Sequence, residues 1–254
     1  MSSYDIFALY YDSLTKNVDY TGRADYLLSL LKRLNHHAGI TLDLACGTGS
    51  LTLELYKKGV DVYGVDSSTA MLSVANEKAY DDNADILFLC QKMQNLNLYG
   101  TVNTVFCCLD CINHLPNLLE VQKAFDKVSF FMEKDGYFIF DFNTKYKHKE
   151  ILANNAFVYE TDEVFCVWQN NYKSKLNKVD ISLDFFEKQD GKYNRYQERF
   201  SEISFDIDDL EKMLIQAGFH NIEFFDDLSF DKPKEKSERI IIVAQKKEMT
   251  NLYG

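Results

Sequence analysis

The stretch TLDLACGTGS, residues 41–50, puts a short run of strand-forming residues directly before two glycines with one residue between them. The run contains a carboxylate, Asp43, and the glycines are Gly47 and Gly49. A glycine-rich turn between a strand and a helix brings bare backbone close to a ligand. The stretch therefore predicts a ligand site at the carboxyl end of a strand.

Runs that read as strands and as amphipathic helices alternate on both sides of this turn. Expected strands are 40–45, 60–66, 84–90, 102–110, 136–142, 221–227 and 238–247. Expected helices are 21–37, 50–59, 68–80, 118–133 and 206–219. Strands that alternate with helices indicate an α/β fold with a mostly parallel sheet and helices on both of its faces.

The alternation breaks between residues 160 and 204, which lack helical periodicity. This segment reads as three antiparallel strands, with a hairpin turn at KQDGK, residues 188–192. An insertion at this point lies at the carboxyl edge of the sheet, where open α/β folds bind ligands. It is either a lid over the substrate or a ribbon for homodimerisation, and one ribbon can serve both roles. The expected division is a core of 1–159 and 205–247 with an N-terminal arm at 1–20, an insertion at 160–204 and a loose tail at 248–254.

Charge and hydropathy restrict the partners. The formal net charge is −11, which disfavours binding to phosphate backbones, so we expect no nucleic-acid partner. No apolar stretch approaches the length that spans a membrane. The opening residues lack the basic-then-apolar order of a signal peptide. We therefore expect a cytoplasmic protein, a monomer or a homodimer joined through the insertion.

A cysteine-rich run, CCLDC at residues 107–111, raises the question of a metal site. Adjacent strand residues point to opposite faces, so Cys107 and Cys108 cannot easily share one ion. No second cysteine pair with zinc-site spacing follows. We expect no metal site.

The glycine turn differs from two common phosphate-binding motifs. A dinucleotide fold requires a third glycine where this chain has Thr52, and a Walker A loop requires a Gly-Lys-Ser/Thr sequence that is absent. Asp43 has the wrong charge to face a phosphate, but it suits an ammonium group. Asp66, at the end of the next strand, can accept hydrogen bonds from ribose hydroxyls. A ribose, an ammonium and no phosphate together indicate S-adenosylmethionine.

Two stretches of the chain resemble motifs of class I S-adenosylmethionine-dependent methyltransferases, in particular the small-molecule branch with a β-ribbon insertion. They are LDLACGTG and VYGVDSSTAMLSVA. The resemblance covers nearly the whole chain, including LFLCQKMQNLNL (87–98), FCCLDCINHL (106–115) and the opening YDIFALYYDSL. It implies a Rossmann-like seven-stranded sheet whose last strand is antiparallel. It also implies methyl transfer to nitrogen or oxygen of a small molecule, by an in-line displacement that depends mainly on positioning.

The resemblance implies a cofactor role for particular residues. Asp43 would lie near the ammonium, and Asp66 would bind the ribose. The family often has an acidic residue where this chain has Lys92; lysine cannot accept a hydrogen bond, so Lys92 either donates to a ring nitrogen or points outward. The other expected contacts are Ala45, Cys46, Gly47 and Gly49 through their backbone around the methionine portion, Ser67 and Met71 beside the ribose and adenine, Gln91 and Met93 at the adenine, and the Leu109 carbonyl near the amino-acid portion.

Two residues are candidates for catalysis. His114 follows the fourth strand and is either a general base or a loop residue that caps the turn before Pro116. Tyr11 either leans over the cofactor, as the resemblance implies, or packs as an ordinary aromatic residue of the N-terminal arm. The alternative to a methyltransferase is a cofactor-binding sensor or partner subunit without turnover, and a nicotinamide oxidoreductase is a more distant third.

Overall fold

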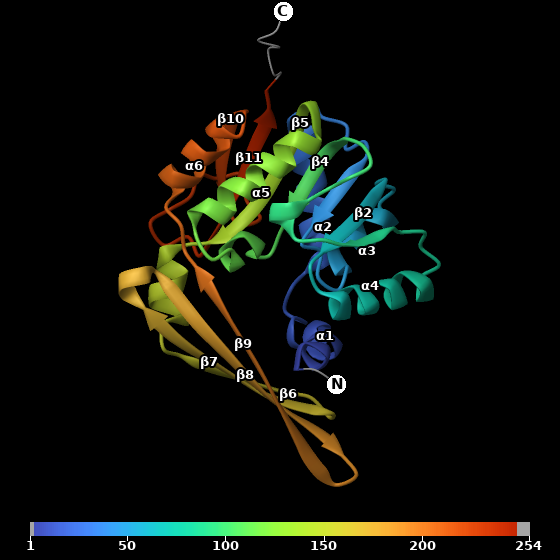
Figure 1. The fold of residues 1–254 in the computed structure, drawn as a ribbon, viewed down its shortest axis with the longest axis vertical. Coiled ribbons are helices and arrows are strands. Elements are labelled where there is room, and N and C mark those ends of the chain that lie inside the picture. The colour runs from blue at the N-terminus through green and yellow to red at the C-terminus, as the bar shows by residue number, and fades with distance from the viewer. Residues whose placement is uncertain (1–2, 248–254) are drawn as a thin grey trace, which may run out of the picture.

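Two β-sheets organise the chain in the computed structural model, which describes residues 3–247 (Figure 1). The expected tail, 248–254, lies outside the described residues. The larger sheet contains β1 (Thr41–Leu44), β2 (Val62–Asp66), β3 (Phe88–Cys90), β4 (Val102–Cys107), β5 (Met132–Asn143), β10 (Phe219–Asp226) and β11 (Arg239–Lys246). The smaller sheet contains β6 (Ala156–Glu160), β7 (Val164–Lys173), β8 (Lys178–Gln189) and β9 (Lys192–Ile203).

The large sheet has the predicted topology. Its order is β10-β11-β5-β4-β1-β2-β3, and β11 runs antiparallel to both of its neighbours. The strands β1 to β5 pair in parallel. Because β1 lies between β2 and β4, the chain order reverses at β1, and open α/β sheets bind ligands at such a point. The expected seven-stranded, Rossmann-like α/β fold is confirmed.

Alternating side chains give the sheet two apolar faces. In β4, Val105 and Cys107 pack with α5 (Leu118–Phe131) and α6 (Ile207–Gln216), whereas Phe106 packs with α2 (Tyr20–Arg33) and α3 (Ser50–Lys57). Successive strand residues point to opposite faces, so a continuous apolar run can serve both layers. The predicted helices on both faces are confirmed. Within residues 3–247, none of the helices is long and apolar enough to cross a membrane.

The insertion differs from the prediction in one respect. The smaller sheet has four antiparallel strands rather than three, and it begins at Ala156, before the expected boundary at residue 160. The additional strand, β6, is a short edge strand on which exposed and half-buried residues alternate, so its sequence carries little apolar signal. The hairpin at 188–192 is confirmed: Asp190 and Gly191 both have positive φ, as a two-residue turn of type I′ requires.

The N-terminal helix α1 (Ser3–Leu14) lies between the insertion and the carboxyl edge of the large sheet (Figure 1). Phe7 packs on Phe185 of β8 with ring centroids 6.1 Å apart. On its other side, Asp12 accepts a hydrogen bond from Thr48 of the glycine turn at 2.6 Å and pairs with Lys78 of α4 (Thr69–Asp81) at 2.6 Å. The helix therefore connects the two sheets at the point where a ligand is expected.

Candidate active site

The glycine turn after β1 presents its backbone to open space. Ala45, Gly47 and Gly49 all have positive φ, at 60°, 55° and 71°. A Cβ built on Gly47 meets no atom of the described chain within 4 Å, whereas a Cβ on Gly49 would lie 2.9 Å from the Cβ of Ala75. Gly49 thus permits close packing of α3 against its neighbours, and Gly47 leaves room above the turn. This arrangement fits a ligand that approaches the backbone closely.

Asp66 connects the tip of β2 to the glycine turn. Its carboxylate accepts hydrogen bonds from the backbone N–H groups of Gly47 at 2.9 Å and Ser68 at 2.8 Å. Burial raises the pKa of Asp66, and the N–H donors from Ser68, Gly47 and Ser67 oppose that rise. Each carboxylate oxygen has a second lone pair, so the group can still accept from ribose hydroxyls. The residues present therefore fit a ribose at the predicted position.

Asp43 lies beneath the turn rather than on its surface. It is 2% exposed, and its carboxylate accepts a hydrogen bond from Thr52 Oγ1 at 2.6 Å. Burial raises the pKa of Asp43 to about 7, although the Thr52 bond opposes the shift. A cation bound above the turn would favour the ionised form of this group. The placement fits an ammonium that interacts with Asp43 without direct exposure of the carboxylate.

The residues expected around the adenine lie beside the tips of β2 and β3. Ser68 caps α4, because its hydroxyl oxygen accepts a hydrogen bond from the N–H of Met71 at 3.3 Å. The side chain of Gln91 bonds both backbone groups of Asn97, at 3.0 and 2.8 Å, and so closes its own loop. Lys92 is exposed. It lies near α5, where it assists Lys123 in lowering the pKa of Glu120.

The loop after β4 has an unusual backbone. Leu109 and Asp110 are consecutive non-glycine residues with φ of 65° and 57°, a conformation that costs on the order of 1–3 kcal/mol per residue. Both N–H groups donate to the buried carboxylate of Asp141, at 2.8 and 2.7 Å. Arg239 then pairs with Asp141 and with Asp110, each at 2.6 Å. This ion network holds the strained loop in place.

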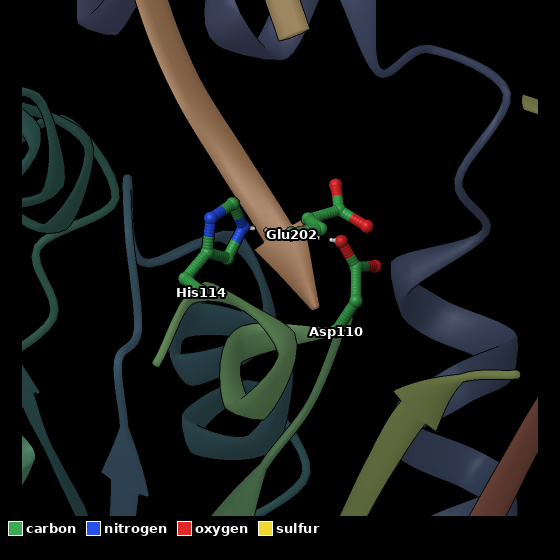
Figure 2. A group of neighbouring side chains, drawn as sticks. All are labelled: Asp110, His114 and Glu202. Atoms are coloured by element: carbon green, nitrogen blue, oxygen red, sulfur yellow. Dashed lines mark ion pairs between the residues drawn. The ribbon is translucent and has the colours of Figure 1, made fainter. Parts of the chain in front are cut away.

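Three side chains converge beyond this loop, as Figure 2 shows. Asp110 and His114 come from the turn after β4, and Glu202 comes from β9 of the insertion. One nitrogen or oxygen atom of each lies within 4.8 Å of the others, and His114 Nε2 is 4.0 Å from Asp110 Oδ2. His114 is exposed, whereas Glu202 is 3% exposed. We call these three residues the carboxylate–histidine cluster.

Glu202 is held by two buried donors. Its Oε2 atom lies 3.0 Å from His148 Nε2 and accepts from Asn143 Nδ2 at 2.9 Å. Burial alone would raise the pKa of Glu202, but the hydrogen bond from His148 and the nearby histidine charges lower it to about 2. The buried donors therefore favour the ionised form of Glu202.

Tyr11 lies at the same loop from the side of α1. Burial raises the pKa of its hydroxyl well above the usual value, and the nearby Tyr20, Asp110 and Cys111 act in the same direction. The hydroxyl therefore stays protonated. Tyr11 can donate a hydrogen bond or pack against a ligand, but it cannot serve as a base near neutral pH.

Sequence reasoning selected His114 and Tyr11 but missed Asp110, Glu202 and His148. Asp110 stands four residues before His114 within the quoted FCCLDCINHL stretch, so one helical turn of spacing was a usable signal. Glu202 follows Phe200 by two residues, and both face inward on β9. The same face of β9 also carries a second buried acid, Glu198, so the strand pattern alone gave no signal that singled out Glu202.

Comparisons with known proteins show which family the chain belongs to. A family model described as a methyltransferase domain matches residues 41–136. A candidate methyltransferase of Geobacillus sp. (strain WCH70) is 33% identical over 96% of this chain and 100% of its own length. A crystal structure of an S-adenosylmethionine-dependent methyltransferase from Clostridium acetobutylicum ATCC 824 is 34% identical, with a TM-score of 0.86 over 96% of this chain and 99% of the other.

A more distant structure shows the same fold. The sugar N-methyltransferase KedS8 of Streptoalloteichus sp. ATCC 53650 is 17% identical, with a TM-score of 0.77 over 94% of this chain and 93% of its own. The full-length relative of Geobacillus and the structure from Clostridium carry the assignment, because they combine identity above 30% with coverage of almost the whole chain. The chain therefore belongs to the class I S-adenosylmethionine-dependent methyltransferases, enzymes of EC 2.1.1 that use S-adenosylmethionine as their methyl donor.

Proposed function

We propose that this enzyme methylates an amino nitrogen of a small molecule, which binds at the carboxylate–histidine cluster. The observation that carries the proposal is the convergence of three hydrogen-bond acceptors within 4.8 Å of one another, two of them carboxylates. Acceptors around a tetrahedral ammonium lie about 4.6 Å apart when each bond is about 2.8 Å long. The size of the cluster therefore suits an amine.

The pairing of Asp110 bears on a divalent metal ion at the same place. In an octahedral Mg²⁺ site with metal–oxygen bonds of about 2.1 Å, neighbouring ligands are about 3.0 Å apart and opposite ligands about 4.2 Å apart. The separation of His114 Nε2 from Asp110 Oδ2 is 4.0 Å. The Asp110 carboxylate, however, is already paired with Arg239. We therefore favour an amine ligand over a metal at this position.

The residues of the cluster have distinct parts in the proposed reaction. The bound cofactor supplies a methyl group on a sulfonium sulfur. An amine must lose a proton before its lone pair can attack, and histidine is the side-chain type that exchanges protons near neutral pH. His114 takes that proton, while Asp110 and Glu202 accept from the remaining N–H groups and so direct the lone pair. The methylated product regains charge and the proton leaves from His114 to solvent, to which it is exposed.

Positioning supplies most of the expected rate enhancement. Holding two reacting groups in line contributes up to about 7–11 kcal/mol. The loop of Leu109 and Asp110 is fixed by Asp141, and the insertion and α1 close the other side. We propose that the insertion acts as a lid over the acceptor. The same insertion also offers a surface for a homodimer contact.

The class of acceptor is supported by two further points. The sugar N-methyltransferase KedS8 shares the fold over 94% of this chain, which makes amino sugars the first acceptors to test. The net charge of −11 supports a small molecule rather than a nucleic acid. We also propose that the protein is cytoplasmic.

The test uses the purified enzyme and methyl-labelled S-adenosylmethionine with a panel of matched acceptors. Amino sugars, polyamines and amino acid amides would each be paired with the alcohol of the same skeleton. Label transfer to amines, with little or none to the matched alcohols, is expected. Transfer to the alcohols instead would contradict the amine acceptor. Cofactor binding without transfer to any member would favour a non-catalytic role.

A further inference from the structure

A buried polar network lies behind the carboxylate–histidine cluster. It consists of Asn113, Asn143, His148 and Glu202, which are 0, 2, 0 and 3% exposed. Asn113 precedes His114, Asn143 ends β5, His148 belongs to the π-helical turn Lys147–Leu152, and Glu202 lies near the end of β9. Four chain segments that are distant in sequence therefore meet through polar side chains.

Two hydrogen bonds of this network meet at one carboxylate oxygen of Glu202. Both His148 Nε2 and Asn143 Nδ2 bond to Oε2 of Glu202. Among the described residues, no hydrogen bond reaches its other oxygen, Oε1. Two donors on one oxygen fix the plane of a carboxylate. Glu202 therefore keeps one oxygen bound to the network, and the other remains available to the cluster.

Asn113 joins the two walls of the site through the same network. Its Nδ2 donates to the carbonyls of Asn143 and Ile203, and its Oδ1 accepts from the N–H of Asn143. Ile203 is the residue after Glu202, and Asn113 is the residue before His114. The end of β9 is thus fixed against the turn that carries His114.

Stability alone does not explain this network. A buried ionic or polar group is costly unless every partner is satisfied, and apolar side chains of similar volume are often at least as stabilising. Within the part of the chain that the structure describes, His148 Nδ1 and Asn143 Oδ1 are buried with no hydrogen-bond partner. The network thus retains unsatisfied polar atoms while it holds a single carboxylate in one orientation.

From this geometry we infer that His148 and Asn143 are positioning residues, which turn Glu202 towards His114 and Asp110 so that the insertion contributes a fixed anion to the acceptor site. This inference rests on the proposed amine acceptor. The two residues do not touch the acceptor themselves. They act through Glu202, so their loss should weaken acceptor binding more than the methyl-transfer step or cofactor binding.

The test compares His148→Leu, which removes the donor, with His148→Gln, whose amide can donate from a similar position. His36→Leu is the matched control, because His36 bonds Thr104 at 3.0 Å in a position distant from the cluster along β4. Crystal structures of the full chain report the orientation of Glu202 without any acceptor. Kinetics with the best amine from the wild-type panel report KM and kcat, and calorimetry reports the Kd for S-adenosylmethionine.

Glu202 should leave the cluster or occupy several orientations in His148→Leu, and should keep its wild-type orientation in His148→Gln and His36→Leu. The KM for the amine should rise by up to about tenfold in His148→Leu, no more than the loss of the Glu202 charge itself, because His148 acts through Glu202. The glutamine variant should recover most of this loss, and kcat and the cofactor Kd should change much less.

An unmoved Glu202 in His148→Leu would overturn the inference. Equal losses in the leucine and glutamine variants, together with a lower Tm and weaker cofactor binding, would indicate a purely structural role and would also overturn it. The two proposals fail separately: a wild-type enzyme that methylates no amine contradicts the proposed function, whereas the crystal structures decide the role of His148 for any acceptor.

Discussion

The regions proposed here as the cofactor side and the acceptor side of this enzyme are built in different ways. The cofactor side uses consecutive residues of one turn and the tip of the neighbouring strand, Gly47 and Asp66, which bond each other at 2.9 Å. The acceptor side combines Asp110 and His114 with Glu202, from a strand about ninety residues further along the chain by the sequence numbering. Backbone shape dominates the first region, and side-chain placement dominates the second.

This difference predicts how each region responds to substitution. A backbone-based site fails when a side chain is added, because a Cβ takes the space that the ligand requires. A site of converging side chains fails when one group is removed or turned away. Substitutions should therefore separate cofactor affinity from acceptor affinity, and any variant that impairs both equally would weaken the comparison.

The largest effect is expected for Gly47→Val. A β-branched side chain at φ of 55° is strained, and its Cβ enters the open space above the turn. Calorimetry should show a loss of cofactor affinity of more than about a hundredfold, since overlap with a ligand costs several kcal/mol. Gly59→Val is the matched control, because Gly59 also has positive φ and open space, and a comparable loss there would show that strain alone is responsible.

Asp66→Ala should weaken S-adenosylmethionine binding by roughly 30–100-fold, because it removes charge-assisted hydrogen bonds to the ribose and to the Gly47 N–H. The Kd can be measured by calorimetry, with Asp61→Ala at the exposed position before β2 as the control. Circular dichroism should show an intact fold. An unchanged Kd would remove Asp66 from the cofactor site.

Cofactor affinity should depend on pH through Asp43. Its pKa is raised to about 7 by burial, so below that pH the group is mostly neutral and attracts the cofactor ammonium less. Affinity should rise by about tenfold as pH increases from 5.5 to 7.5, because each pKa unit corresponds to at most a tenfold change. Asp43→Asn should give a flat profile, and a variant that keeps the wild-type slope would assign the titration elsewhere.

Glu202→Gln should act on the acceptor side alone. Loss of one anion from the cluster should raise the KM for an amine by about tenfold, as expected for one charged hydrogen bond. The Kd for the cofactor should stay within error of the wild-type value. Glu160→Gln on the exposed face of β6 is the control. A change in cofactor Kd as large as the change in KM would contradict the separation of the two regions.

The smallest effect is expected from metal removal. Because Asp110 is already paired with Arg239 and the cluster is proposed to bind an amine, dialysis against EDTA should leave the methylation rate within about twofold of its starting value. The rate with added Mg²⁺ or Mn²⁺ provides the comparison. Activity that disappears with EDTA and returns with one metal would replace the amine proposal with a metal-assisted one.

The sequence by itself determined the large sheet and placed together the residues proposed for the cofactor side. Strand and helix periods are local, and the tips of neighbouring parallel strands meet at one edge of the sheet, so the sequence alone puts Gly47 near Asp66. The hairpin at Asp190 and Gly191 was equally readable, since two-residue turns demand residues that accept positive φ.

Only the tertiary structure brought together the residues proposed for the acceptor side. Side chains alternate along a strand, so a shift of one residue in the pairing of β8 with β9 would turn Glu202 to the opposite face. Nothing local to Glu202 indicates that its partners are His148 and Asn143, or that Asn113 fixes β9 against the turn after β4. Those contacts depend on how the insertion docks on the core, and packing between distant segments sets that geometry.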